Sequence, residues 1–74
     1  MLILYGTESC HLCDEAQGIL RQFNLVWQNV DIIEDDTLLQ RYGTTIPVLR
    51  RQDNGRELYW PFGAQEIQAF IQQR

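Results

Sequence analysis

Residues 4–16 read LYGTESCHLCDEA, and they place both cysteines and the only histidine of the chain directly after an apolar run. The run starts at residue 1 and stops at Gly6, and a continuous apolar run of this kind is typical of a strand that is covered on both faces of a sheet. After the cysteines, apolar residues recur at helical spacing and predict a helix over residues 11–23. We therefore expect Cys10 and Cys13 at a strand-to-helix junction, with the strand at the centre of the sheet.

The remainder of the chain predicts three more strands and two more helices. Strands are expected at residues 25–32, 47–51 and 56–60, and the DNG sequence at 53–55 marks a hairpin between the last two. A short helix containing Tyr42 is expected after a cap at Asp35 or Asp36, with Gly43 suited to its C′ position. An amphipathic helix is expected over residues 63–74.

These elements predict a single α/β domain over residues 1–74, with the order βαβαββα and a four-stranded mixed sheet flanked by three helices. The net charge is −4, and all six basic residues are arginines. An acidic chain without a basic face is not expected to bind nucleic acid. The apolar runs are far shorter than the roughly 20 residues of a membrane span, and no basic signal region precedes them. We predict a cytoplasmic monomer with no membrane partner.

The cysteine pair predicts a reactive dithiol. The N-terminus of a helix carries unsatisfied N–H groups and the positive end of the helix dipole, and both stabilise an anion. Cys10 at this position is expected to form a thiolate more readily than a free cysteine, and Cys13, one turn later, is placed to resolve a mixed disulfide. His11 has two interpretations that the sequence leaves open: a partial positive charge that aids the thiolate, or a solvated side chain.

Other uses of the cysteines fit the pattern less well. Structural zinc needs four Cys or His ligands, whereas the chain offers only three, Cys10, His11 and Cys13. Attachment of a c-type haem needs a histidine after the second cysteine, where Asp14 stands. A disulfide between residues this close constrains the unfolded chain little. We predict a redox dithiol with no metal.

The segment LYGTESCHLCDEA, together with TTIPVL at residues 44–49, resembles the thioredoxin superfamily and specifically short glutaredoxin-like proteins with a C-H-L-C motif. The resemblance implies a thioredoxin-like, glutaredoxin-type fold in which Pro47 is cis and lies beside Cys10. It also implies that the backbone of Ile46 pairs with an extended substrate segment.

This sequence departs from the glutaredoxin pattern at the residues that hold glutathione. It has no lysine, and only Gly63 matches the Gly-Gly-x-Asp segment before the last helix. Gly63 and the N–H groups after it remain candidates for binding a carboxylate, with Arg41 as the nearest cationic substitute.

The resemblance and the dithiol together predict a thiol–disulfide oxidoreductase of cell redox homeostasis. The predicted catalytic residues are Cys10 and Cys13, and the predicted substrate-binding residues are Ile46, Pro47, His11 and Gly63. No cofactor is required, the substrate is a disulfide-containing protein or a small thiol, and a separate reductant restores the dithiol; glutathione is a candidate on the resemblance alone. Two alternatives stay open: a glutathione-assisted iron–sulfur or metal-binding module, and a redox-inactive thioredoxin-fold scaffold.

Overall fold

A computed structural model describes residues 1–72 of the chain. The strands are β1 (Leu2–Gly6), β2 (Trp27–Asp31), β3 (Val48–Arg51) and β4 (Glu57–Tyr59). The helices are α1 (His11–Gln22), the 3₁₀ turn η1 (Ile32–Glu34), α2 (Asp36–Tyr42) and α3 (Ala64–Gln72). The predicted order βαβαββα is confirmed, and the last two residues of the expected final helix, 73–74, lie outside the described residues.

The four strands form one mixed sheet in the order β2-β1-β3-β4. β1 is parallel to β2 and antiparallel to β3, and β3 is antiparallel to β4. β1 is therefore a central strand, as its continuous apolar sequence predicts. Leu4 of β1 lies opposite Leu49 of β3, and Tyr5 lies opposite Val48. Since neighbouring residues point to opposite faces, these two pairs serve two different cores.

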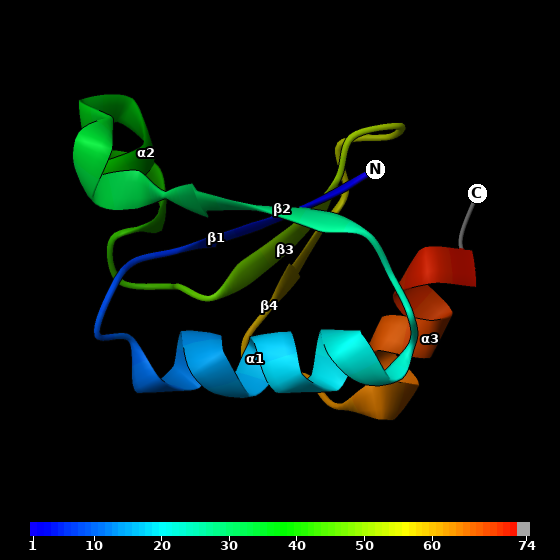
Figure 1. Cartoon of the computed structure of the whole chain (residues 1–74). Coiled ribbons are helices and arrows are strands. Elements are labelled where there is room, and N and C mark those ends of the chain that lie inside the picture. Colours follow the sequence, from blue (N-terminus) through cyan, green and yellow to red (C-terminus); the bar gives the residue numbers. More distant parts are fainter. Residues whose placement is uncertain (73–74) are drawn as a thin grey trace.

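Helices cover both faces of the sheet (Figure 1). α1 and α3 pack on one face, and α2 lies on the other. The core beneath α1 and α3 contains Leu2, Leu4, Ala16, Leu20, Leu49, Phe62, Ile67 and Phe70. The core beneath α2 contains Tyr5, Ile32, Tyr42 and Val48. Each fully buried aliphatic side chain contributes about 1.5–3 kcal/mol, so the α1 and α3 face supplies most of the hydrophobic stabilisation. None of the helices within residues 1–72 is long and apolar enough to cross a membrane.

α2 begins as predicted but ends differently. The Asp35 carboxylate accepts the N–H of Thr37 at 2.9 Å and that of Leu38 at 3.3 Å, so Asp35 is the cap. Gly43 ends the helix with φ −54° and ψ −28°, which is right-handed rather than the left-handed conformation usual at C′. A Cβ atom at residue 43 would lie 2.5 Å from the Leu39 carbonyl oxygen. Glycine is thus needed here because the backbone approaches closely, and not because of a positive φ.

The predicted hairpin is confirmed between β3 and β4. Its loop spans residues 52–56, and the N–H of Arg51 donates to the carbonyl of Arg56 at 2.9 Å. Gly55 has φ +72°, a conformation that glycine adopts without steric cost. The Asn54 side chain accepts the N–H of Arg56 at 2.9 Å. The DNG sequence therefore provides both the left-handed residue and a side-chain acceptor that closes the turn.

Candidate redox site

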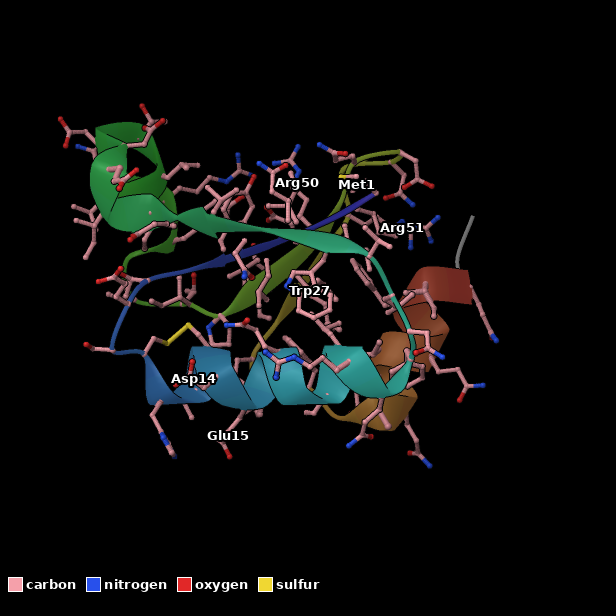
Figure 2. All side chains as sticks on the ribbon, viewed as in Figure 1. Met1, Asp14, Glu15, Trp27, Arg50 and Arg51 are labelled. Carbon is pink, nitrogen blue, oxygen red and sulfur yellow. A yellow bond between two sulfur atoms is a disulfide. The ribbon has the colours of Figure 1, made fainter. Side chains whose placement is uncertain are left out.

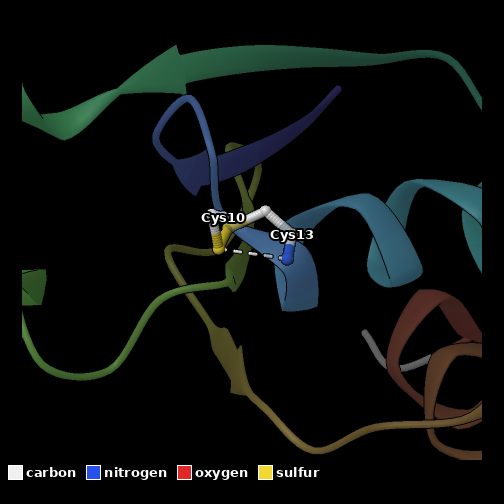
Figure 3. Close-up of a disulfide and its surroundings, with 2 residues drawn as sticks. All are labelled: Cys10 and Cys13. Carbon is white, nitrogen blue, oxygen red and sulfur yellow. Dashed lines mark hydrogen bonds between the residues drawn. A yellow bond between two sulfur atoms is a disulfide. The ribbon is translucent and has the colours of Figure 1, made fainter.

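The two cysteines lie where the chain leaves β1 and enters α1 (Figure 3). Cys10 is the N-cap residue of α1, in an extended conformation. Its Sγ accepts the N–H of Cys13 at 3.1 Å, and its carbonyl accepts the N–H of Asp14 at 3.1 Å. Ser9 has φ +60°, which turns the chain into the helix. The predicted placement of Cys10 at the helix start is confirmed.

Cys10 and Cys13 are joined by a disulfide, with their Cα atoms 5.2 Å apart. The two residues differ in exposure, because Cys13 is only 4% exposed while Cys10 is half-buried. His11 and Leu12, between them, are exposed. An incoming thiol or disulfide therefore meets Cys10 first, and Cys13 is shielded behind it. This asymmetry matches an attacking and a resolving sulfur.

The surroundings of Cys10 favour its thiolate once the disulfide is reduced. A hydrogen bond from a backbone N–H to sulfur is stronger when the sulfur is charged, and the Cys13 N–H is already aimed at Cys10 Sγ. The dipole of the 12-residue helix α1 acts in the same direction. Both effects stabilise the anion through the backbone alone. The thiolate is the nucleophilic form of cysteine.

Gly6, the last residue of β1, makes room for the buried cysteine. A Cβ atom at residue 6 would lie 2.8 Å from Cys13 Sγ and 3.3 Å from Cys13 Cβ. The first distance is shorter than van der Waals contact allows, so only glycine fits without a shift. Gly6 therefore does more than end the apolar run, because its missing side chain sets how closely α1 approaches the sheet.

Pro47 lies at the same end of the sheet. The Ile46–Pro47 peptide bond is cis, as the resemblance implies, and Pro47 is fully buried. Because Val48 pairs with Tyr5, Pro47 follows in register at the level of Gly6, which contacts Cys13. The segment that enters β3 passes beside the disulfide in Figures 2 and 3. The structure thus brings together Cys10, Cys13 and the cis proline.

Ile46, predicted to pair with substrate, has part of its backbone engaged already. Its N–H donates to the carbonyl of Tyr42 at 3.2 Å. An extended substrate would therefore pair with the Ile46 carbonyl oxygen unless this internal bond opened. A second cis bond, Trp60–Pro61, stands between β4 and α3 and was not predicted.

The two positions nominated for glutathione carboxylates contact the protein's own carboxylates. The N–H of Gly63 donates to Glu66 Oε1 at 2.6 Å. Arg41 lies on α2, 3.6 Å from Glu57 Oε2 and over the Tyr42 ring. The Gly63-x-x-Glu66 spacing in the sequence indicates the contact between the Gly63 N–H and Glu66, since a glutamate three residues after a helix cap reaches back to the cap N–H.

A polar cluster around Glu57 supports the loop that carries Pro47, and the sequence patterns do not reveal it. The Tyr42 hydroxyl donates to Glu57 Oε2, the Tyr59 hydroxyl donates to Oε1 at 2.7 Å, and Arg50 lies 3.6 Å from Oε2. The Tyr42 ring stacks on Tyr5 with centroids 4.5 Å apart. The Tyr42 carbonyl then accepts the N–H groups of residues 45 and 46. This cluster fixes Tyr42, and Tyr42 in turn fixes the loop that leads to the cis peptide.

The cluster also shifts the acidity of its members. Burial raises the pKa of Tyr42, and the hydrogen bond to Glu57 raises it further. Burial by itself would raise the pKa of Glu57, but hydrogen bonds from Tyr42 and Tyr59 and the nearby arginines hold that pKa below its usual value. Glu57 is therefore an ionised carboxylate at neutral pH. Within residues 1–72, no three His, Cys, Asp or Glu side chains are grouped so that they could hold a metal ion.

A mixed four-stranded sheet with a Cys-x-x-Cys pair at the start of the first helix defines a thioredoxin-fold protein. The chain belongs to the family of the Glutaredoxin-like domain (DUF836), whose model matches residues 1–72.

Solved structures agree with this assignment. Target protein XcR50 from X. campestris, solved by X-ray, is 42% identical, with a TM-score of 0.89 over 96% of this chain and 95% of that chain. Protein Ne2328 from Nitrosomonas europaea, solved by NMR, is 28% identical, with a TM-score of 0.81 over 93% of this chain and 87% of that chain. A mutant form of the thioredoxin-like protein BC3987 is 16% identical, with a TM-score of 0.72 over 96% of this chain and 99% of that chain, and supports the fold alone. No curated protein matches the chain significantly.

Proposed function

We propose that the chain is a thiol–disulfide oxidoreductase in which Cys10 is the nucleophile and Cys13 the resolving cysteine. One observation carries the proposal: the disulfide joins a half-buried sulfur that caps a helix to a sulfur that is almost fully buried. A structural staple would not need the accessible sulfur at a helix N-terminus. Membership of a glutaredoxin-like family supports the same chemistry.

The reaction begins from the reduced dithiol. The Cys10 thiolate attacks one sulfur of a substrate disulfide, a Cys10–substrate bond forms, the substrate S–S bond breaks, and the departing thiolate takes up a proton. Cys13, after losing its proton, then attacks Cys10 Sγ and releases the second substrate thiol. Two electrons pass from the dithiol to the substrate, and the Cys10–Cys13 disulfide remains. A separate thiol reductant reverses these two steps.

The other predicted residues have supporting roles in this proposal. Pro47, buried at the level of Gly6, shapes the surface beside the disulfide, and the carbonyl of Ile46 accepts a hydrogen bond from an extended substrate segment. Exposed His11 contacts the substrate. Gly63 contributes only if a substrate carboxylate displaces Glu66. The reaction requires no bound cofactor, and we propose that it serves redox homeostasis in the cytoplasm.

The decisive experiment follows thiol alkylation against pH in the reduced protein and in Cys10→Ser and Cys13→Ser separately. Cys10 should react rapidly and titrate with a pKa below about 7.5, whereas the buried Cys13 should react slowly. Cys13→Ser should also form a stable mixed disulfide when its Cys10 thiolate attacks a substrate disulfide and displaces one substrate thiolate, because the resolving sulfur is missing. A Cys10 that titrates near 8.5, roughly the value of an unperturbed cysteine, would support the scaffold alternative. Faster reaction at Cys13 would reverse the two roles.

A further inference from the structure

An open pocket of about 430 Å³ adjoins the disulfide on the side of β2. Cys13 forms part of its wall, and so do Glu8 and Ser9, which directly precede Cys10. Residues from β1, α1, β2 and η1 complete the wall. Cys10 itself does not line the pocket, but its neighbours Glu8 and Ser9 and its disulfide partner Cys13 do, so a substrate bonded to Cys10 lies at the edge of this pocket. The chemistry of the wall bears directly on which substrates the dithiol accepts.

The wall of this pocket is acidic. No Lys, Arg or His within residues 1–72 lines it. Four carboxylates do: Glu8, Asp14, Asp31 and Glu34. Asp31 accepts the N–H of Ile33 at 3.0 Å, so one of the four also caps η1. Figure 2 shows Asp14 on the side of α1 that faces the sheet, whereas Glu15 points away from it. The acidic wall therefore lies on one side of α1, and it combines residues from separate elements of the fold.

A second feature of the pocket wall is a neutral hydroxyl group. Thr7 also lines the pocket, and the Thr7 hydroxyl oxygen is buried with no hydrogen-bond partner among the described residues. Buried polar atoms almost always have a partner, so an orphan one beside an open pocket is satisfied by a ligand or a water molecule. A group that donates hydrogen bonds fits the carboxylates of the wall. Ammonium and guanidinium groups are such donors and carry the complementary charge.

The structure also disfavours anionic substrates elsewhere in the site. Gly63 N–H is occupied by Glu66, and Arg41 is paired with Glu57. Glutathione carries two carboxylates, and two of the groups considered for them, the Gly63 N–H and Arg41, contact internal carboxylates. A substrate with negative charge near its sulfur would therefore meet like charge in the pocket and an occupied donor at the start of α3.

We propose that the site selects disulfides with a positive charge next to the sulfur, and that its partner is a protein segment with Lys or Arg beside the reacting cysteine. The inference rests on the proposed function and adds the substrate class to it. The carboxylates attract such a segment before the chemical step, which raises the rate of encounter. For a cationic against an anionic disulfide of similar size, we expect about a tenfold preference at physiological salt.

The test measures second-order rate constants for oxidation of the reduced protein by three disulfides. Cystamine is cationic, bis(2-hydroxyethyl) disulfide is neutral and 3,3′-dithiodipropionate is anionic. The pocket variant Asp14→Asn/Glu34→Gln removes two wall charges from α1 and η1. The control variant Glu15→Gln/Asp36→Asn removes two charges at neighbouring positions outside the wall. Both variants change the net charge equally, and a ratio of rates within one variant cancels any change in Cys10 acidity.

The pocket variant should lower the cystamine to dithiodipropionate ratio about fivefold, and the control variant should change it less than about twofold. The ratio should also approach that of a free model thiol at about 1 M salt, where the Debye length is about 3 Å. Equal effects of the two variants would overturn the proposal, since they would reflect net charge rather than the pocket.

Peptide substrates then test the partner itself. A mixed disulfide of Lys-Cys-Lys should be reduced faster than that of Glu-Cys-Glu, with the difference smaller in the pocket variant. Equal rates for the two peptides would overturn the assignment of a basic protein segment. Failure to react with the neutral disulfide would instead reject the proposed function, so the two ideas fail separately.

Discussion

Substitution of Gly6 by alanine tests how tightly Cys13 is packed against β1. The new Cβ atom would lie 2.8 Å from Cys13 Sγ and 3.3 Å from Cys13 Cβ. Cys13 is 4% exposed and bonded to Cys10, so its sulfur cannot move aside as a flexible side-chain end can. The strain must then pass to α1 or to β1. Overpacking of this kind costs about 1–3 kcal/mol, so we expect the oxidised variant to unfold more easily by that amount.

The cost depends on the oxidation state. In the reduced protein Cys13 Sγ is no longer tied to Cys10 and can rotate away from residue 6, so the loss of stability should be smaller by about 1 kcal/mol. This difference appears directly in the redox equilibrium. Since 30 mV corresponds to about 1.4 kcal/mol for a two-electron couple, the reduction potential should rise by about 20 mV. Gly6→Ala should therefore make the protein a slightly stronger oxidant.

The assay combines denaturant unfolding of the oxidised and reduced forms with redox titration against a dithiol buffer. Gly18→Ala is the matched control, because a Cβ atom at that position in α1 would have no described atom within 4 Å apart from its chain neighbours and the backbone of its own helix. Alanine in an open helical position should stabilise both forms by up to about 1 kcal/mol and leave the potential unchanged. The close-packing argument would be refuted if Gly6→Ala matched the wild type in stability, or if both oxidation states lost the same amount.

Further predictions concern the supporting structure. Glu57→Gln should cost about 1–3 kcal/mol at neutral pH, because it removes a charged acceptor from Tyr42 and Tyr59. The folded state holds the pKa of Glu57 below its ordinary 4.5, so its contribution is present above that pH and is lost as the pH falls through the folded value. Urea midpoints measured from neutral to acidic pH should accordingly fall more steeply in the wild type than in Glu57→Gln, and parallel curves would contradict this. Asp35→Ala should cost about 1 kcal/mol through loss of the α2 cap, whereas Asp36→Ala, whose carboxylate is only in the first turn, should cost less by the same unfolding measurement. Leu20→Ala should cost about 2–5 kcal/mol because the side chain is fully buried, and Leu39→Ala, at 42% exposure, should cost much less; equal losses would mean that the core is assigned wrongly.

The order of elements and the position of the dithiol were predictable from the sequence because both depend on local patterns. Apolar periodicity locates β1 and α1, and the cysteines fall between them whatever the rest of the chain does. Asp35 and the DNG turn are equally local, since a cap or a turn is satisfied by residues a few positions away. For the same reason the sequence identifies Gly43 as the end of α2. In the structure, however, this glycine is needed for a close backbone approach and not for a positive φ.

Contacts between distant residues were not predictable from the same patterns. Tyr42 and Glu57 are 15 positions apart and meet only because the sheet places β4 near α2. The acidic pocket likewise combines positions 8, 14, 31 and 34, which show no common period. The close approach of Gly6 to Cys13 depends on the angle at which α1 packs on the sheet. These contacts depend on how the helices and strands pack in three dimensions, which local patterns in a single sequence do not show.

Cys10 also has a consequence for the mutational tolerance of the protein. The sulfur that we propose as the nucleophile is the same atom that caps α1, a position where serine, threonine, aspartate and asparagine are preferred. In the proposed mechanism, replacement of Cys10 by alanine would remove activity, and it would also weaken the start of the helix that carries Cys13, at a cost of about 1 kcal/mol. Serine keeps an acceptor at the cap and separates the two effects. Natural loss of Cys10 to a residue without a side-chain acceptor is therefore expected to leave a less stable protein, and cells should degrade such variants faster than the wild type.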